Sequence, residues 1–383
     1  MIGTLRAGAE FFQVEELPVY ATSGQGEHLF VRIEKRGITS EDAARRLARA
    51  FRVERRDVGF AGRKDRHAVA RQWLSVRTPS SEFPGGYQDA SLRVLELQRH
   101  RNKLRLGHLH GNRFRLGLEL EPRHDAVLQR ALERVQHQGL LHRFGAQRFG
   151  WNGANLAVAR HWATERYGEA VELVMDPDGG WVTADPLPER RPAGYAARCL
   201  DSLRHRPGDY AAALRATGPT FRKLIASAAQ SAVFNAVLDA RVDAGLLFEL
   251  REGDVARAGR GAPFLCKSER LEALNREVQP GDLKVTATGP LPGKHCLLAR
   301  KGIHEQELEW SAVTQVDWAW FAPGALLASP GERRPLLVRV LEPPRLERDG
   351  EQVWLELCLP RGAYATELLG QIGIRLPEDR RTP

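Results

Sequence analysis

Three segments of the chain alternate apolar with polar residues, a period of two that is typical of half-buried β-strands. These segments are residues 28–34, 114–120 and 353–359. In the first of them, Leu29, Val31 and Ile33 fall on one face. A shorter strand is expected at residues 73–77. Strands are therefore expected near both ends of the chain.

A period near 3.6 residues instead predicts helices over residues 39–51, 125–139 and 219–247. The first helix has the clearest start, because Thr39 or Ser40 can cap it and two acidic residues follow in its first turn. Between about residues 151 and 335 the strand pattern recedes and the character of the chain changes. We therefore expect a separate domain in the middle of the sequence.

Composition is that of an ordinary globular protein, with 383 residues, 42% of them apolar and 27% charged. This length allows two or three domains with a large core. The formal net charge of +9 suits a polyanionic partner. Only eight of the 57 basic side chains are lysine. Arginine binds phosphate through a planar fork, but a bias toward arginine can also reflect genome composition, so both explanations stay open.

The cysteines are far apart and include no Cys-x-x-Cys pair, which argues against a zinc knuckle or a redox motif. They are Cys199, Cys266, Cys296 and Cys358. Such cysteines fit reduced thiols and a cytoplasmic protein. The N-terminus lacks the pattern of a signal peptide, and no apolar run is long enough to span a membrane. Residues 289–294 superficially resemble a phosphate-binding loop, but the spacing is wrong and His295 stands where Ser or Thr is needed.

The most informative chemistry is a single aspartate, Asp65, inside a basic cluster. Arg63, Lys64, Arg66 and His67 surround it in the sequence. Cations close to a carboxylate lower its pKa and keep it ionised. From this pattern alone, Asp65 is either an ion-pair partner or a nucleophile or base.

Residues 61–68, followed by Gln72 and Trp73, resemble the central motif of the tRNA pseudouridine synthase D (TruD) family. Further segments resemble other motifs of that family and occur in the family's order. They are residues 11–16, 111–114, 144–150, 227–235 and 360–369. The resemblance covers nearly the whole chain. It departs from the usual family pattern at His142-Arg143 and at Gly370-Gln371, where the residues usual in the family are replaced.

This resemblance implies an α+β fold with two domains. Residues 1–140 and 336–383 would form a pseudouridine-synthase-type catalytic domain with a central mixed, mostly antiparallel sheet. Residues 141–335 would form an inserted α/β TRUD domain. The implied activity is isomerisation of a tRNA uridine, typically the one at position 13, to pseudouridine, with Asp65 as the catalytic nucleophile.

By the same resemblance, four residues would contact the uridine: Phe11, Asn112, Phe114 and Tyr364. An aromatic ring offers a stacking surface, and an amide can read the edge of uracil. Five basic residues are candidates for contacts with RNA phosphates: Arg63, Lys64, Arg99, Arg101 and Lys103. A run such as 99–105 can equally be an ordinary solvated surface.

Isomerisation of a nucleoside needs no redox step, no ATP and no metal, so we expect no cofactor. The expected partner is tRNA, with no membrane association, no obligate protein partner and a monomeric state. Two alternatives remain at this stage. One is an RNA-binding protein without catalysis, in which Asp65 only forms an ion pair. The other is a carboxylate-dependent glycoside hydrolase, for which Glu15 is the candidate second acid.

Overall fold

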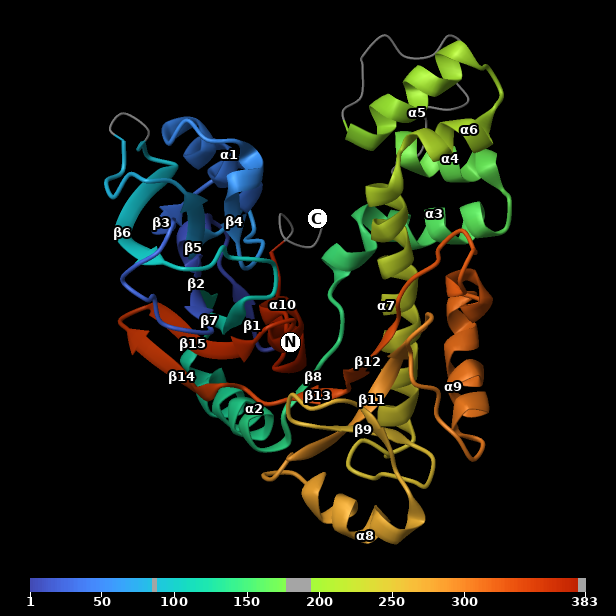
Figure 1. Ribbon diagram of the computed structural model, residues 1–383. Helices are drawn as coiled ribbons and strands as arrows, with labels where there is room; N and C mark the ends of the chain where they lie inside the picture. Colours follow the sequence, from blue (N-terminus) through green and yellow to red (C-terminus); the bar gives the residue numbers. More distant parts are fainter. Residues whose placement is uncertain (85–87, 177–193, 378–383) are drawn as a thin grey trace. The chain divides into compact units, whose positions relative to one another are not determined.

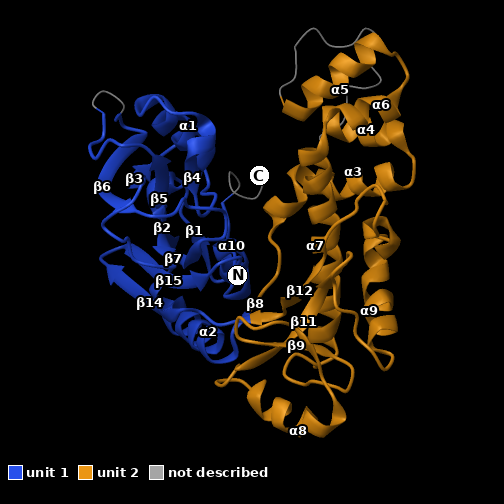
Figure 2. Ribbon diagram, viewed as in Figure 1, with its two compact units in different colours: residues 1–140, 338–379 blue, residues 141–337, 380–383 orange. Residues whose placement is uncertain are grey.

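The computed structural model describes residues 1–84, 88–176 and 194–377 (Figure 1). Within it the chain folds into two compact units (Figure 2). Of the described residues, unit 1 contains those of 1–140 and 338–377, and unit 2 contains those of 141–337. The expected boundaries were 140/141 and 335/336. The second boundary therefore lies two residues later in the structure than the sequence suggested.

A mixed sheet that contains ten strands of the described chain organises unit 1. Its main path runs in the order β14 (Glu342–Asp349), β15 (Gln352–Pro360), β7 (Leu109–Glu119), β2 (Phe12–Pro18), β5 (Val69–Arg77), β3 (His28–Lys35) and β6 (Leu92–His100). Three short strands complete it: β1 (Gly3–Leu5), β4 (Val58–Phe60) and β16 (Ile374–Arg375). Among the described strands of this sheet, only the β2–β5 and β1–β16 pairs are parallel. The sheet is mixed and mostly antiparallel, as predicted.

Three helices pack on one face of this sheet: α1 (Ser40–Ala50), α2 (Asp125–Gln138) and α10 (Ala365–Gln371). On β5, Ala70 belongs to the apolar cluster with α2 and α10, whereas Leu74 and Val76 belong to the cluster with α1. Since these residues occupy alternate positions of one strand, both clusters lie on the same face. We call it the helix face, and the other side the opposite face.

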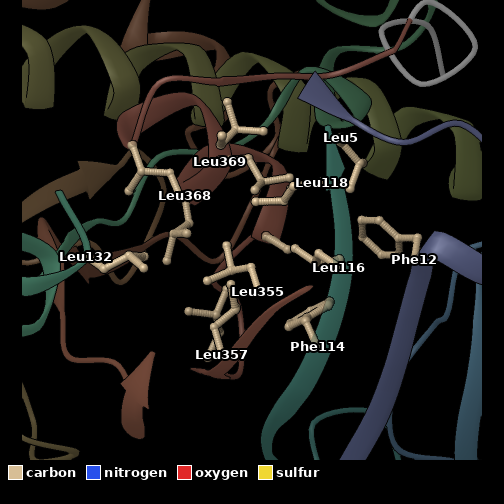
Figure 3. Close-up of a cluster of buried hydrophobic side chains, with 14 of the residues drawn as sticks. Leu5, Phe12, Phe114, Leu116, Leu118, Leu132, Leu355, Leu357, Leu368 and Leu369 are labelled. Atoms are coloured by element: carbon tan, nitrogen blue, oxygen red, sulfur yellow. The ribbon is translucent and has the colours of Figure 1, made fainter. Parts of the chain in front are cut away.

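Figure 3 shows the larger of these clusters, where strand and helix side chains converge. Phe114, Leu116 and Leu118 of β7 contribute alternate residues, as the period of two predicted. Leu132 of α2 and Leu368 of α10 cover them. The alternation found in the sequence therefore determines which side chains face the helices.

Unit 2 is built around the long helix α7 (Pro219–Asp243), which packs against a small antiparallel sheet and further helices. The sheet has the order β10 (Phe264–Leu265), β9 (Val255–Ala258), β11 (Val285–Leu291) and β12 (Glu332–Pro335). The other helices are α3 (Ala154–Ala163), α4 (Tyr167–Met175), α5 (Gly194–His205), α6 (Tyr210–Ala216), α8 (Ser268–Glu277) and α9 (Ile303–Ser311). Strands β8 (Leu140–Leu141) and β13 (Leu337–Val338) form a separate two-stranded pair.

The predicted helices occur close to their expected bounds. Thr39 is the residue that caps α1, because its side chain accepts a hydrogen bond from the backbone N–H of Asp42 in a capping box. Helix α7 ends at Asp243, four residues before the expected end, and Gly245 follows with a φ of 72°. The four cysteines are free and buried, in agreement with the prediction of reduced thiols. In the part of the chain that the structure describes, no helix is both long and apolar enough to cross a membrane.

Candidate active site

Asp65 lies in the loop between β4 and β5, and its side chain is half-buried. Its Oδ1 accepts a hydrogen bond of 2.9 Å from the backbone N–H of His67, which folds the carboxylate back over its own turn. The carboxylate is thus neither sealed inside the protein nor on a freely solvated tip. Loops held by regular structure are a usual place for reactive groups.

Lys35, the last residue of β3, supports the main chain at Asp65. Its ammonium group donates hydrogen bonds to the carbonyl oxygens of Asp65, at 2.6 Å, and of Ile38, at 2.7 Å. The lysine is completely buried. Burial lowers the pKa of Lys35 to about 8, although the nearby Asp65 carboxylate acts in the other direction. A buried ammonium group therefore holds the backbone of the candidate nucleophile in place.

Lys64, next to Asp65, turns inward and forms an ion pair with Glu16 of β2. Lys64 Nζ lies 2.7 Å from Glu16 Oε2, and the side chains keep only 4% and 2% of their exposure. The Glu16 carboxylate also accepts the backbone N–H of Trp73. Burial raises the pKa of Glu16, and Lys64 partly opposes that shift. A Cβ on Gly62 would lie 2.8 Å from Lys64 Nζ, so glycine leaves the room that this pair needs.

Ser40, at the start of α1, adds a third attachment of the loop. Its Oγ accepts a hydrogen bond of 2.8 Å from the backbone N–H of Lys64 and donates one of 2.7 Å to Gln72 Oε1. Together with Lys35 and Glu16, it ties residues 64 and 65 to α1 and to three strands of the sheet. These contacts fix the position of the backbone at Asp65; they do not serve to neutralise the charge of its carboxylate.

Asn112 and Phe114 lie on β7 and point to the helix face, the face to which Glu16 also points. Asn112 is paired with Glu16 in the register of β2 and β7. Its Oδ1 is buried and, among the described residues, has no hydrogen-bond partner. Phe114 is 7% exposed and packs edge-to-face against Phe12, with ring centroids 6.0 Å apart. An acceptor without a partner in such a place is unusual and suits a site that reads a ligand.

Phe11 lies on the opposite face of the sheet, and the structure does not bring it together with Asn112 and Phe114. It ends the short helix η1 (Ala9–Phe11) and covers Gly117, where a Cβ would lie 2.5 Å from its ring. Its ring centroid is 6.0 Å from that of Trp354. Phe12 is the aromatic residue of this segment that points to the helix face.

Tyr364 is half-buried and directly precedes α10, after the end of β15. In the β15–β7 register, Pro360 pairs with Gly111. Tyr364 thus follows the strand end that lies beside Asn112. Asn112 and Tyr364 therefore come from the ends of two neighbouring strands of unit 1.

The five candidates for phosphate contacts differ in their surroundings. Arg63 and Arg101 are exposed, and within the described residues neither has an ion-pair partner closer than 4.0 Å. Lys64 does not fit the expected phosphate contact, because its ammonium group is buried against Glu16. The Arg99 guanidinium donates to the carbonyl oxygens of Thr78, Pro79 and Ser80 at 2.6–2.7 Å. Lys103 Nζ donates to the carbonyl oxygen of Arg56.

Residues that sequence reasoning missed are Glu16, Lys35, Ser40 and Gln72. One signal could have found Glu16: the spacing Phe-x-Val-x-Glu fits Phe12, Val14 and Glu16 without any offset. Glu15, the expected second acid of a glycoside hydrolase, points away from Glu16 to the opposite face and pairs with Arg32. Across the described residues, no group of three or more His, Cys, Asp or Glu side chains is arranged to hold a metal ion.

Comparisons with known proteins agree with the resemblance found in the motifs. The family model described as tRNA pseudouridine synthase D (TruD) matches residues 1–179 and 189–372. A protein from Geobacter metallireducens named tRNA pseudouridine synthase D is 38% identical, over 97% of this chain and 94% of its own length. One of the same name from Geobacter sulfurreducens is 37% identical, over 97% of this chain and 93% of its own length.

A solved structure supports the fold. The crystal structure of a protein from Methanosarcina mazei, described as a putative tRNA pseudouridine synthase D, superposes with a TM-score of 0.71 at 24% identity. The match covers 97% of this chain and 93% of that one. With an α+β fold of this kind and the family match along almost its whole length, the chain belongs to the tRNA pseudouridine synthase D (TruD) family, a family of isomerases.

Proposed function

We propose that this tRNA pseudouridine synthase converts the uridine at position 13 of tRNA to pseudouridine, with Asp65 as its nucleophile. The observation that carries the proposal is the way Asp65 is held: the residue is half-buried, and its backbone carbonyl accepts a hydrogen bond from the buried Lys35. A carboxylate that served only as an ion-pair partner would not need such support. The choice of position 13 comes from the resemblance to the family.

The reaction breaks the bond between N1 of uracil and C1′ of the ribose and forms a bond from C5 to C1′. The proton on C5 leaves, and N1 gains one. Substrate and product are isomers, so the reaction balances without an oxidant or a group donor. Asp65 can act by attack at C1′, by attack at C6, or by taking a proton from the sugar. All three routes use one ionised carboxylate next to the nucleoside.

The neighbouring residues would bind the extruded nucleoside. An enzyme that acts on a base takes it out of its stack and holds it by stacking and by hydrogen bonds to its edge. Asn112, with a buried Oδ1 that no described group satisfies, is suited to the uracil edge. Phe114, with the adjacent ring of Phe12, and Tyr364 would supply aromatic rings. The exposed guanidinium groups of Arg63 and Arg101 are suited to the phosphates.

The test is release of tritium from tRNA labelled at C5 of uridine. Asp65→Asn should abolish release while the Kd for tRNA stays within a few-fold of that of the wild type. Asp57→Asn, a change at another half-buried aspartate just before β4, provides the control and should retain release. Tritium release by Asp65→Asn would remove Asp65 from the role of nucleophile.

Position 13 is tested separately. Pseudouridine is mapped in tRNA after incubation with the enzyme, and a transcript carrying cytidine at position 13 should yield none. Pseudouridine at another position would overturn the choice of uridine but not the role of Asp65. Tight tRNA binding by the wild-type protein without any tritium release would instead favour a non-catalytic RNA-binding protein.

A further inference from the structure

Two adjoining cavities in unit 1 play no part in the proposed chemistry. The larger, of about 510 Å³, falls in the usual size range of ligand pockets. It is lined by Tyr20, His100, Asn102, Lys103, Arg105 and His108. The smaller, of about 230 Å³, has an apolar lining that includes Phe30, Trp73 and Leu104. Tyr20 and His108 line both cavities, so the two form one continuous surface.

Aromatic rings dominate the walls of these cavities. Tyr20 and His100 stack with centroids 5.1 Å apart and an interplanar angle of 11°. The Tyr20 hydroxyl lies 3.2 Å from His108 Nδ1, which fixes the rim between the two cavities. Phe30 and Trp73 add two tilted rings at the base, with centroids 6.3 Å apart. Flat rings arranged in this way suit a flat ligand.

The lining of the larger cavity includes positively charged side chains. His100 Nδ1 accepts a hydrogen bond from the backbone N–H of Ser23, so its ring is neutral. Lys103 and Arg105 are the lysine and arginine side chains of this lining, and both carry a positive charge. Arg105 is exposed and, within the described part of the chain, has no ion pair closer than 4.0 Å. No acidic side chain lines this cavity.

The smaller cavity has one acidic residue, Glu16, whose carboxylate is bound to Lys64. Glu16 thus lines this cavity and also holds the residue that precedes Asp65. Phe30 and Trp73 belong to the opposite face of the sheet, whereas Asn112 and Phe114 belong to the helix face. The aromatic walls of the cavities therefore lie on the other face of the sheet from Asn112 and Phe114, and Glu16 is the residue that both regions share.

We propose that these two cavities bind a second nucleotide of the RNA, distinct from the uridine that reacts. Its base would lie against the aromatic walls around Tyr20, and its phosphate would lie at Arg105, beside Lys103, whose ammonium group also donates to the carbonyl oxygen of Arg56. Base stacking on aromatic side chains together with a cationic backbone contact is the usual way to hold single-stranded RNA. The inference rests on the proposed function only in taking RNA as the ligand.

The test uses the full-length enzyme and unlabelled tRNA transcripts, and reads binding rather than turnover. Arg105→Gln should raise the Kd about tenfold and reduce the slope of log Kd against log salt by roughly one. Arg130→Gln, at an exposed arginine of α2, is the matched control and should leave both unchanged. If Arg105→Gln and Arg130→Gln have the same Kd and the same salt dependence, the proposed binding site is wrong.

A second pair of variants tests the stacking surface. Tyr20→Phe keeps the ring and should retain most of the affinity, whereas Tyr20→Leu should lose about tenfold. Transcripts containing 4-thiouridine should crosslink on irradiation to peptides that contain Tyr20 or His100. Equal binding by both Tyr20 variants without such crosslinks would also reject the proposal. Because none of these readouts needs tritium release, failure of the subsite is distinguishable from failure of Asp65 as nucleophile.

Discussion

Glu16 and Lys64 form an ion pair 2.7 Å long that is almost completely sealed from solvent. It joins β2 to the loop that carries Asp65. Desolvating two charges costs several kcal/mol for each, and their attraction barely exceeds that cost. Such a pair adds little net stability compared with an apolar pair of the same size. We therefore hypothesise that the Glu16–Lys64 pair serves to fix the position of the loop that carries Asp65. The following variants test this hypothesis.

Glu16→Gln should destabilise unit 1 and lower turnover. It leaves the Lys64 ammonium buried without a counter-charge, which typically costs about 3–5 kcal/mol. The double variant Glu16→Gln with Lys64→Met removes that charge and should recover much of the stability but not the turnover. Urea unfolding and tritium release measure the two effects.

The adjacent residue provides the control for this experiment. Glu15 pairs with Arg32, and both side chains keep about 30% of their exposure. Glu15→Gln should therefore change the free energy of unfolding by no more than about 1 kcal/mol. Full activity of the double variant would show that the Glu16–Lys64 pair does not position Asp65.

Gly62→Ala should disturb the same ion pair without removing either charge. The new Cβ would lie 2.8 Å from Lys64 Nζ and 3.1 Å from Glu16 Oε2, closer than side chains normally approach. Turnover should fall about as much as in the double variant. Gly370→Ala in α10 is the control, because its Cβ would meet nothing within 4 Å and alanine favours a helix by about 1 kcal/mol. Wild-type turnover in Gly62→Ala would contradict the steric argument.

Lys35 should make stability depend on pH in the alkaline range. Burial lowers its pKa from 10.5 to about 8 in the folded protein, so between these values the unfolded chain binds more protons. The contribution of Lys35 to the free energy of unfolding therefore increases as the pH is raised from 8 to 10.5, by at most about 1.4 kcal/mol per pH unit. The difference between wild type and Lys35→Met in urea unfolding should show this rise.

The baseline for that measurement is Lys223→Met, a change at an exposed lysine of α7. A wild-type curve parallel to that of Lys35→Met across the same alkaline range would mean that Lys35 is not held in the way the structure indicates. The hydrogen bonds from the Lys35 ammonium group to the carbonyl oxygens of Asp65 and Ile38 would then be absent in solution.

Local patterns were sufficient to predict much of this fold. The period of two in residues 114–120 and 353–359 predicted β7 and β15, because each strand buries one face and leaves the other less covered. Thr39 or Ser40 was predicted as the cap of α1 from the residues just around it, and the structure shows that Thr39 is the cap, in a capping box that is itself a local structure. Asp65 was found because its motif is contiguous in the sequence.

The contacts that hold Asp65 were not predictable in the same way. Lys64 and Glu16 form an ion pair although they are 48 positions apart in the sequence, and Lys35 binds the carbonyl oxygen of Asp65 over a separation of 30 positions. Lysine and glutamate are usually exposed, so nothing in a single sequence indicates that these turn inward. The same limit applies to Arg99, which the basic run suggested for phosphate and which instead binds three carbonyl groups.

Asn112→Ala should lower activity without lowering stability, a combination that separates a ligand contact from a structural one. Its Oδ1 is buried and without a partner among the described residues, so its removal eliminates a polar atom that already lacks a hydrogen bond. The loss of such an atom should leave the free energy of unfolding unchanged or raise it, whereas the loss of a satisfied buried amide costs about 1–3 kcal/mol. If Asn112 reads the uracil edge, kcat/KM should fall by about 10- to 100-fold. Urea unfolding and tritium release test both parts, and a destabilised but active variant would assign Asn112 to the fold of β7 rather than to the substrate.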